Sequence, residues 1–210
     1  MLILPHLVNF ALLTTKHFKI DESHGISHGM NVLHYSHKIL TSELKENPYL
    51  DSHRNIIYTS ALLHDLCDKK YMNESKGLEN INRFLRENTL LSKTEIYMVD
   101  RIIDTMSYSK IKVAGYPSLG KYQLAYHIVR EGDLLTAYDF DRSIIYNMNN
   151  KHSDFFTSFN EASSLFETRT FKHNEDQLFI TDFSKKESIL LEKQAISRMI
   201  IWKELLGTTK

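Results

Sequence analysis

Apolar residues recur every three to four positions along most of the chain, which is the spacing of amphipathic helices and not the alternation of half-buried strands. Gly115, Pro117 and Gly120 interrupt this pattern and predict a loop over residues 109–120. The periodic segments on either side predict helices at about residues 2–19, 25–45, 51–65, 74–87, 92–108, 121–140, 154–172 and 184–206. We therefore predict an all-α fold.

The composition agrees with a helical protein. Only 7 Gly and 3 Pro among 210 residues leave little material for the turns of a many-stranded protein. No internal repeat and no linker rich in Gly, Ser or Pro divides the chain. We therefore expect one domain over residues 1–210, with its motifs at about residues 21–145 and C-terminal helices at about 150–206 packed on it.

Charge and cysteine usage narrow the partners. Lys and Arg number 26, as do Asp and Glu, so the net charge is near zero and neither a nucleic-acid polymer nor a membrane is an expected partner. The single cysteine, Cys67, excludes an internal disulfide and fits a reducing compartment. The apolar N-terminal segment lacks a basic leader and contains Pro5 and Asn9, so we interpret it as a helix and expect a cytoplasmic protein. The sequence does not indicate the oligomeric state.

His64 and Asp65 form the first candidate site, at the end of a predicted helix. Ile57, Ala61 and His64 share one face of that helix, so His64 is expected to point toward the core. A buried imidazole beside a carboxylate is costly unless both have partners. A divalent metal is one such partner, and a plain hydrogen-bonded pair is the other.

His28 occupies a similar position on the preceding helix. It lies on an otherwise apolar stripe made of Val32, Tyr35 and Ile39. His24 precedes it by one turn, and two histidines at i and i+4 share a face at a spacing that is compatible with a metal, although it also recurs by chance.

Asp133 is the third anomaly, a carboxylate on an apolar helical stripe. Its neighbours at helical spacing are Tyr126, Val129, Ala137 and Phe140. A buried carboxylate without a partner would cost several kcal/mol or become protonated. A metal held by other helices would remove the anomaly, and an ion pair with Arg130 or Arg142 is the alternative.

Together, His28, His64, Asp65 and Asp133 offer two imidazoles and two carboxylates. This donor set suits a divalent cation such as Mn²⁺, Mg²⁺, Fe²⁺ or Ni²⁺, whereas a structural zinc would favour thiolates. Four protein ligands in an octahedral sphere would leave about two positions for water and substrate, as a hydrolytic metal requires.

The order H…HD…D is the signature of the HD superfamily of metal-dependent phosphohydrolases, and the chain resembles a bacterial branch of small HD hydrolases. Four segments carry the resemblance in order. DESHGISH at 21–28 resembles D-x-S-H-D-x-x-H, and ALLHDLCDKK at 61–70 resembles A-L-L-H-D-I-x-D-x-K. IIDTMSYSK at 102–110 resembles I-I-x-x-x-S-F-S-K, and IVREGDLLTA at 128–137 is similar to V-Q-D-A-D-R-L-D-A.

The resemblance implies an all-α fold with one metal, Mn²⁺ being favoured, held by His28, His64, Asp65 and Asp133. It also implies hydrolysis of a phosphoester or phosphoanhydride, with nucleotides, including nucleoside triphosphates, as substrates. The chain departs from the branch's pattern around the site and not at the ligands, so the departures bear on the choice of substrate. These departures are Gly25 for Asp, Asn31 for Arg, and Leu134 and Thr136 for Arg and Asp.

Residues near these motifs are candidates for handling the substrate. We expect Asp68 to accept a proton from the attacking water or to position it. Lys70 is expected to neutralise phosphate charge, and His24 to donate to a phosphate oxygen or protonate the leaving group. For each the alternative is a solvated surface residue. The substrate-binding candidates are Lys69, Ser107 and Lys110.

Two other functions stay open. A nucleotide sensor could retain the metal site without turnover, and the departures at Gly25 and Asn31 favour it. An iron oxygenase on the same helical scaffold would need ligands for a second metal, and His127 is the sole additional histidine near the last motif. A turnover assay separates the hydrolase from the sensor, and iron-dependent oxygen consumption would identify the oxygenase.

Overall fold

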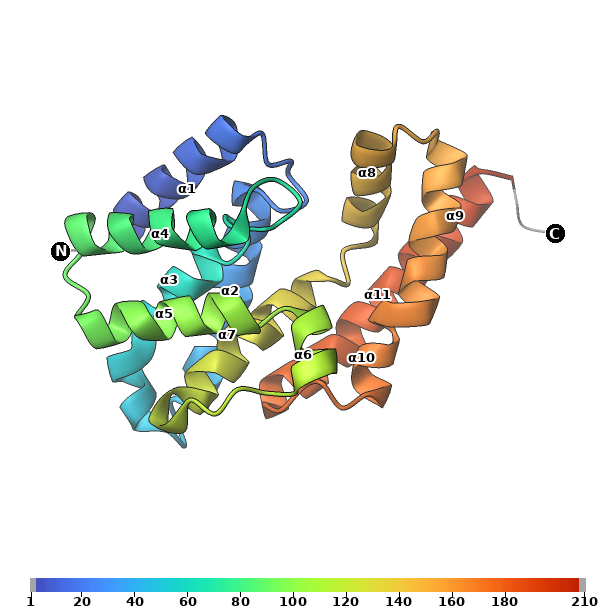
Figure 1. Cartoon of the computed structure of the whole chain (residues 1–210). Helices are drawn as coiled ribbons and strands as arrows, with labels where there is room; N and C mark the ends of the chain where they lie inside the picture. Colours follow the sequence, from blue (N-terminus) through green and yellow to red (C-terminus); the bar gives the residue numbers. More distant parts are fainter. Residues whose placement is uncertain (1–2, 208–210) are drawn as a thin grey trace. The chain divides into compact units, whose positions relative to one another are not determined.

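The computed structural model describes residues 3–207, and these residues contain helices and no strand, which confirms the all-α prediction (Figure 1). Two 3-10 segments, η1 (Pro48–His53) and η2 (Gly120–Tyr122), and one wider π-helical turn, η3 (Phe166–Thr170), accompany the α-helices. The α-helices are α1 (Leu4–Phe18), α2 (Ile26–Glu43), α3 (Arg54–Leu63), α4 (Glu74–Asn88), α5 (Lys93–Thr105), α6 (Tyr108–Ala114), α7 (Gln123–Thr136), α8 (Phe140–Lys151), α9 (Phe155–Leu165), α10 (Lys172–Glu175) and α11 (Asp182–Leu205).

Side-chain caps explain where several helices begin. The Ser92 side chain accepts a hydrogen bond from the Glu95 amide, and the Glu95 carboxylate accepts one from the Ser92 amide, which forms a capping box at the start of α5. This confirms the predicted helix start at residues 92–95. Asn73 caps α4 and Thr181 caps α11 through one side-chain hydrogen bond each, because each oxygen accepts from an amide of the first turn.

The helix boundaries differ from the prediction in the middle of the chain. The predicted loop at 109–120 contains α6, which Ser107 caps. The predicted helix at 121–140 breaks after Thr136, because Asp139 caps a new helix through the Arg142 amide. This helix, α8, continues to Lys151, where no helix was predicted. Leu2, where the first helix was predicted to begin, lies outside the described residues.

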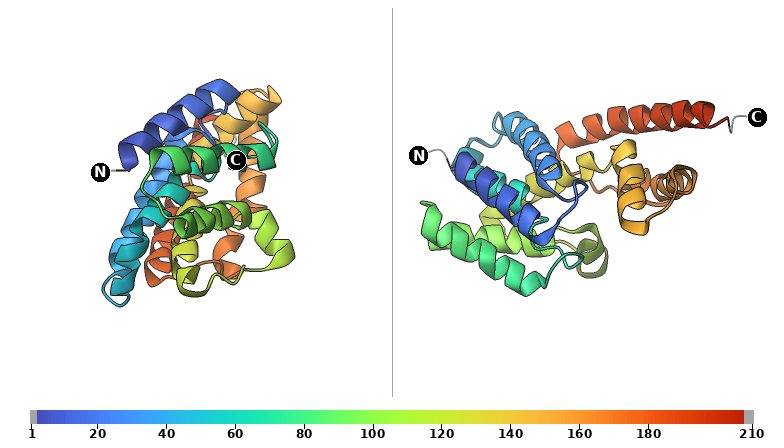
Figure 2. Two further views of the ribbon diagram at one scale, coloured as in Figure 1. Left: turned by 60° about the vertical axis from the view of Figure 1, so that its left-hand side comes forward. Right: turned by 90° about the horizontal axis from the view of Figure 1, so that it is seen from above.

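The chain divides into two compact units, Met1–Asp133 and Leu134–Lys210. In the first unit, α3 packs against α1, α2 and α5 (Figure 2), and it buries every residue from Thr59 to Leu63. This explains the run of apolar and small residues just before His64. The expectation of one domain over residues 1–210 remains a prediction.

The second unit has a core of its own. Phe140 meets Phe159 and Phe166 edge to face, and α11 contributes Ala195 and Met199 to the same cluster.

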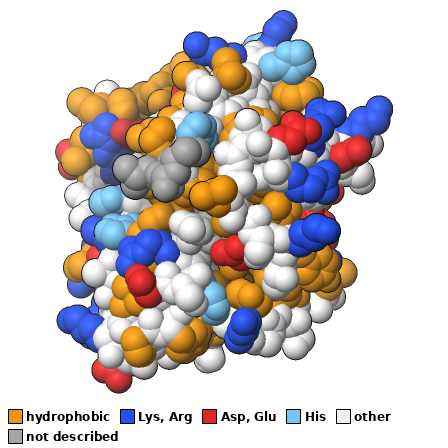
Figure 3. Space-filling model, turned by 90° about the vertical axis from the view of Figure 1, so that its left-hand side faces the viewer, with side chains coloured by type: hydrophobic (Ala, Val, Ile, Leu, Met, Phe, Trp, Pro, Cys, Tyr) orange, Lys and Arg blue, Asp and Glu red, His pale blue; other side chains and the backbone are white. Residues whose placement is uncertain are grey.

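No helix among residues 3–207 is long and apolar enough to cross a lipid bilayer. On the face that Figure 3 draws, acidic and basic side chains are interspersed with apolar ones, in keeping with the balanced composition.

Candidate metal centre

His28 lies in the first turn of α2 and points into the first unit, where its side chain is 2% exposed. The next residue, Gly29, explains its position. A Cβ atom at Gly29 would lie 2.9 Å from the backbone oxygen of Leu62, so only glycine lets α2 come this close to the end of α3. This close approach sets His28 beside His64.

His64 caps the C-terminal end of α3, and Asp65 follows in the turn. The Nδ1 atom of His64 lies 2.9 Å from the carbonyl oxygen of Ala61. Because a carbonyl oxygen only accepts hydrogen bonds, Nδ1 carries the proton and donates it. When the ring is neutral, it presents the lone pair of Nε2 to the interior, which is the arrangement of a metal-ligating histidine whose other nitrogen is held by the backbone.

Asp133 lies in the last turns of α7 and faces the same space. Its neighbour Gly132 packs against α2, since a Cβ atom there would lie 2.5 Å from Oγ of Ser36 and 3.0 Å from the backbone oxygen of Val32. A second glycine thus brings a second helix close to α2. Glycine contacts therefore fix the spacing of the three helix regions that carry the candidate ligands.

We call His28, His64, Asp65 and Asp133 the His/Asp group. The Nε2 atom of His28 lies 3.2 Å from Nε2 of His64, 3.3 Å from Oδ2 of Asp65 and 3.3 Å from Oδ1 of Asp133. The Nε2 atom of His64 lies 3.3 Å from Oδ1 of Asp65 and 3.6 Å from Oδ1 of Asp133. The four side chains that the sequence singled out therefore meet at one point.

These separations fit ligands of one cation. Ligands about 2.1 Å from a metal lie about 3.0 Å apart at right angles and about 3.4 Å apart in a tetrahedron. The ligating atoms of His28, His64 and Asp65 all lie within 4.8 Å of one another, so this group could hold a metal ion. The contact of 3.2 Å between the two imidazole nitrogens is compatible with a shared cation and with a hydrogen bond.

The electrostatics of the group in its metal-free form favour charge pairing. Burial lowers the pKa of His64, but the charge of Asp65 and a hydrogen bond that the ring donates to Asp133 outweigh burial and raise it to about 9. Burial raises the pKa of Asp65, but His64 and His28 together lower it to about 2. For Asp133, the two imidazoles likewise overcome burial and hold the pKa well below its usual range. The site therefore favours ionised carboxylates.

Two of the predicted substrate-handling residues lie next to this group. The ring centroids of His24 and His28 are 6.4 Å apart. The Nζ atom of Lys70, an exposed residue, lies 2.8 Å from Nε2 of His24, although 46 residues separate the two in the sequence. The structure thus brings His24 and Lys70 together beside the His/Asp group.

The other candidates have different surroundings. Asp68 is half-buried, and its Oδ1 accepts a hydrogen bond of 2.7 Å from the Lys70 amide, while Lys69 is exposed. Ser107 caps α6, and the ammonium of Lys110 bonds to Glu74 at 2.6 Å and to Asp104. Their predicted substrate roles stay predictions.

Sequence reasoning assigned no role to Tyr71, whose hydroxyl bonds to Asp21 and lies 3.2 Å from Nδ1 of His24. Tyr71 follows Lys70 directly, which is the only local signal. His127, considered as a ligand for a second metal, contacts Gln123, and burial together with the charge of Arg130 lowers its pKa to about 4.

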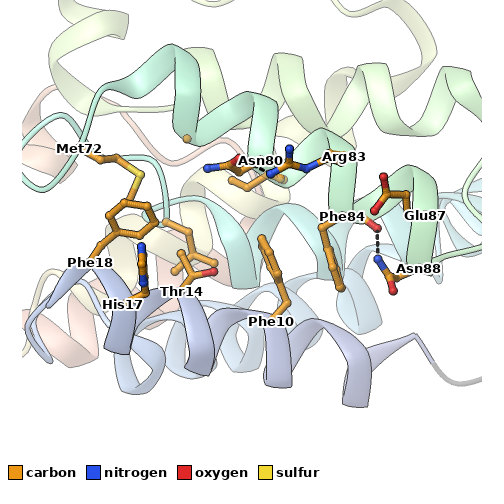
Figure 4. Close-up of a pocket in the computed structure, with 13 residues that line it drawn as sticks. Phe10, Thr14, His17, Phe18, Met72, Asn80, Arg83, Phe84, Glu87 and Asn88 are labelled. Carbon is orange, nitrogen blue, oxygen red and sulfur yellow. Dashed lines mark hydrogen bonds between the residues drawn. The ribbon is translucent and has the colours of Figure 1, made fainter.

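A cavity of about 300 Å³ lies between α1 and α4 (Figure 4). Phe10 and Phe84 stack in its wall with ring centroids 4.0 Å apart, and Met72 and Phe18 lie at one end. Its lining contains no member of the His/Asp group. A more open hollow of about 560 Å³ is lined by Arg101, Lys110 and Tyr116, among others.

Comparisons with known proteins support the fold. No protein-family model matches the chain, and no curated protein sequence matches it. A crystal structure of a Lactobacillus plantarum protein, determined as a structural genomics target, superposes with a TM-score of 0.72 at 19% sequence identity. The similarity covers 98% of this chain and 97% of that chain. At this identity the likeness shows a shared helical fold and carries no statement about activity.

Proposed function

We propose that the protein is a metal-dependent phosphohydrolase acting on a nucleotide or a related small phosphate ester or anhydride. The observation that carries the proposal is the His/Asp group, whose ligating atoms approach to between 3.2 and 3.6 Å. Lys70, an exposed cation held beside the group by His24, supports an anionic substrate.

The donor set bears on the metal. Two imidazoles and two carboxylates fit Mn²⁺, Mg²⁺, Fe²⁺ or Ni²⁺, and we favour Mn²⁺. Burial raises the pKa of the Cys67 thiol to about 12, so this side chain stays protonated and is a poor metal ligand. Bound at this site, such a cation would polarise a phosphoryl oxygen and lower the pKa of a coordinated water.

The chain's own residues take the remaining roles in this proposal. Lys70 neutralises negative charge on the phosphate. This charge grows in the transition state as the leaving oxygen departs. Asp68 accepts the proton of the attacking water through Oδ2, because its Oδ1 already binds the Lys70 amide. His28 and His64 are buried and would hold the cation.

A substrate screen tests the proposal. The metal-free protein is reloaded with Mn²⁺ and offered nucleoside mono-, di- and triphosphates, and phosphate and pyrophosphate are measured separately. We expect release of one of these products by the wild type and by Asp182→Ala, a control whose side chain is 85% exposed, and none by Asp65→Ala.

The alternatives predict other results. If the protein binds metal and nucleotide but releases no product, the hydrolase proposal is wrong and a nucleotide sensor is favoured. Iron-dependent oxygen consumption would instead indicate an oxygenase.

A further inference from the structure

A continuous set of hydrogen bonds joins the loop before α2 to the turn that follows Asp65. We call its members, Asp21, Ser23, His24, Lys70 and Tyr71, the Lys70 network. Asp21 accepts from the hydroxyls of both Ser23 and Tyr71. Nδ1 of His24 lies 2.6 Å from Oγ of Ser23 and 3.2 Å from the Tyr71 hydroxyl, and Nε2 lies 2.8 Å from Nζ of Lys70.

The donors and acceptors of this network have one consistent direction. A lysine ammonium has donors only, so Nε2 of His24 accepts from Lys70 and carries no proton. The proton of the neutral ring then lies on Nδ1, which donates to Ser23 and Tyr71. Their hydroxyl hydrogens point to Asp21, whose carboxylate only accepts. Lys70 at Nε2 and the Asp21 carboxylate behind Ser23 and Tyr71 at Nδ1 therefore favour the same tautomer of His24.

Both ends of the network are fixed by local backbone structure. Oδ1 of Asp21 accepts the Ser23 amide at 2.9 Å, and the backbone oxygen of Asp21 accepts the His24 amide at 3.0 Å. A Cβ atom at Gly25 would lie 2.9 Å from that same oxygen, so the departure from Asp at this position lets the loop close tightly.

At the other end, Asp68 holds the turn that carries Lys70 and Tyr71. Its Oδ1 accepts the Lys70 amide at 2.7 Å, and its backbone oxygen accepts the Tyr71 amide at 3.0 Å. The hydroxyl of Tyr71 and the ammonium of Lys70 therefore reach the same histidine ring from two consecutive residues.

We propose that Asp21 and Tyr71 are positioning residues, which hold His24 as the Nδ1–H tautomer so that its Nε2 keeps the Lys70 ammonium beside the His/Asp group, where it meets a phosphate of the substrate. The phosphate in this statement rests on the proposed function, whereas the tautomer and the placement of Lys70 do not. In this arrangement Nε2 of His24 accepts a hydrogen bond from Lys70, and His24 does not act as an acid toward the leaving group.

The first test reads the tautomer directly. Long-range ¹⁵N–¹H spectra of the metal-free protein, with His24 assigned by His24→Gln, report which ring nitrogen carries the proton. We expect Nδ1–H in the wild type and a mixture of tautomers in Tyr71→Phe. Tyr58→Phe is the matched control, because the Tyr58 hydroxyl lies 2.6 Å from Nδ1 of another histidine, His37. Nε2–H in the wild type, or an unchanged spectrum in Tyr71→Phe, would overturn the proposal.

The second test asks whether Tyr71 acts through Lys70. Binding of inorganic pyrophosphate to the Mn²⁺-loaded protein is measured by calorimetry, and kcat/KM is measured for a substrate found in the screen. We expect Tyr71→Phe and Lys70→Ala each to weaken pyrophosphate binding about tenfold, with no further loss in the double variant. Additive losses in the double variant would contradict the proposal.

A second variant guards against a folding defect. Asp21→Asn keeps the size of the side chain and is expected to mix the His24 tautomers as Tyr71→Phe does, with an unchanged far-ultraviolet circular dichroism spectrum. If Asp21→Asn leaves the tautomer unchanged, the positioning role is wrong. If the tautomer responds as expected but no phosphate compound is bound or hydrolysed, the proposed function fails while the positioning of His24 stands.

Discussion

The His/Asp group and the Lys70 network are neighbours in the first unit, yet they are held in place by different means. The imidazoles of His28 and His64 are buried, and their positions follow from helices brought together at Gly29 and Gly132. Lys70 is exposed, and its position follows from side-chain hydrogen bonds between two loops.

This difference suits different tasks. A cation needs ligands that do not move, because small changes in ligand position lower its affinity. A lysine that meets a substrate must instead leave one partner for another, and an exposed side chain can do so. Substitutions in the His/Asp group should therefore abolish metal binding, whereas those in the network should alter substrate handling with the metal retained.

The largest effect is expected for Asp133→Ala. Removing this carboxylate leaves two imidazoles and Asp65, so both metal content and turnover should fall by more than the roughly 100-fold that loss of an outer partner costs. Elemental analysis of the purified variant measures the metal, with the exposed Asp182→Ala as the control. Full metal content in Asp133→Ala would remove Asp133 from the ligand set.

Asp68→Asn should have the next largest effect and should separate the two regions. The amide keeps the size of the side chain and still accepts the Lys70 amide through its oxygen, but it cannot take a proton. Turnover should fall about 100-fold while metal content stays the same. Near-normal turnover would show that Asp68 only shapes the turn.

Gly132→Ala tests whether helix spacing sets the His/Asp group. The added Cβ would lie 2.5 Å from Oγ of Ser36, so we expect a loss of about 1–3 kcal/mol in stability together with weaker Mn²⁺ binding. Denaturant unfolding and metal titration measure the two effects. Adding Ser36→Ala removes the closest atom and should restore part of both, and no recovery would show that the spacing argument is wrong.

The sequence could predict the His/Asp group because each member is a polar residue at an unusual place. His28 and Asp133 lie on apolar helical stripes, and His64 and Asp65 end a buried helix. The same signal predicted most helices. It missed α6, which has no buried residue and therefore no apolar period. It also missed the break at Asp139, whose cap lies within a periodic segment, and most of α8, because no helix was predicted between residues 140 and 154.

The Lys70 network could not be predicted in the same way. Tyr71 and Asp21 are 50 residues apart and lie in loops, where no periodicity relates one residue to another. The role of Gly29 was also hidden, because a glycine in a helix gives no sign of which backbone it approaches. Contacts of this kind depend on the tertiary arrangement and not on the local pattern.

The smallest expected effect is on the pH dependence of stability. In the metal-free protein, the pKa of His64 is raised from 6.5 to about 9, so its contribution is complete below pH 6.5 and is lost as the pH rises toward 9. The pKa of Asp65 is lowered from 3.8 to about 2, so its contribution is present above pH 3.8 and is lost as the pH falls toward 2. Charge pairing within the group therefore stabilises the metal-free protein most between about pH 4 and 6.5.

A bound cation should change this dependence, because metal-ligating imidazoles are neutral and the metal must displace their protons. The Tm of the metal-free protein should fall between pH 6.5 and 8, whereas the increase in Tm on adding Mn²⁺ should grow over the same range. Thermal unfolding with and without Mn²⁺ measures both trends, and His34→Gln, which removes an exposed imidazole, should leave them unchanged. If the increase in Tm on adding Mn²⁺ stays constant or shrinks as the pH rises, the cation does not compete with protons at His64. The His/Asp group would then be a buried cluster of ion pairs and not a metal site.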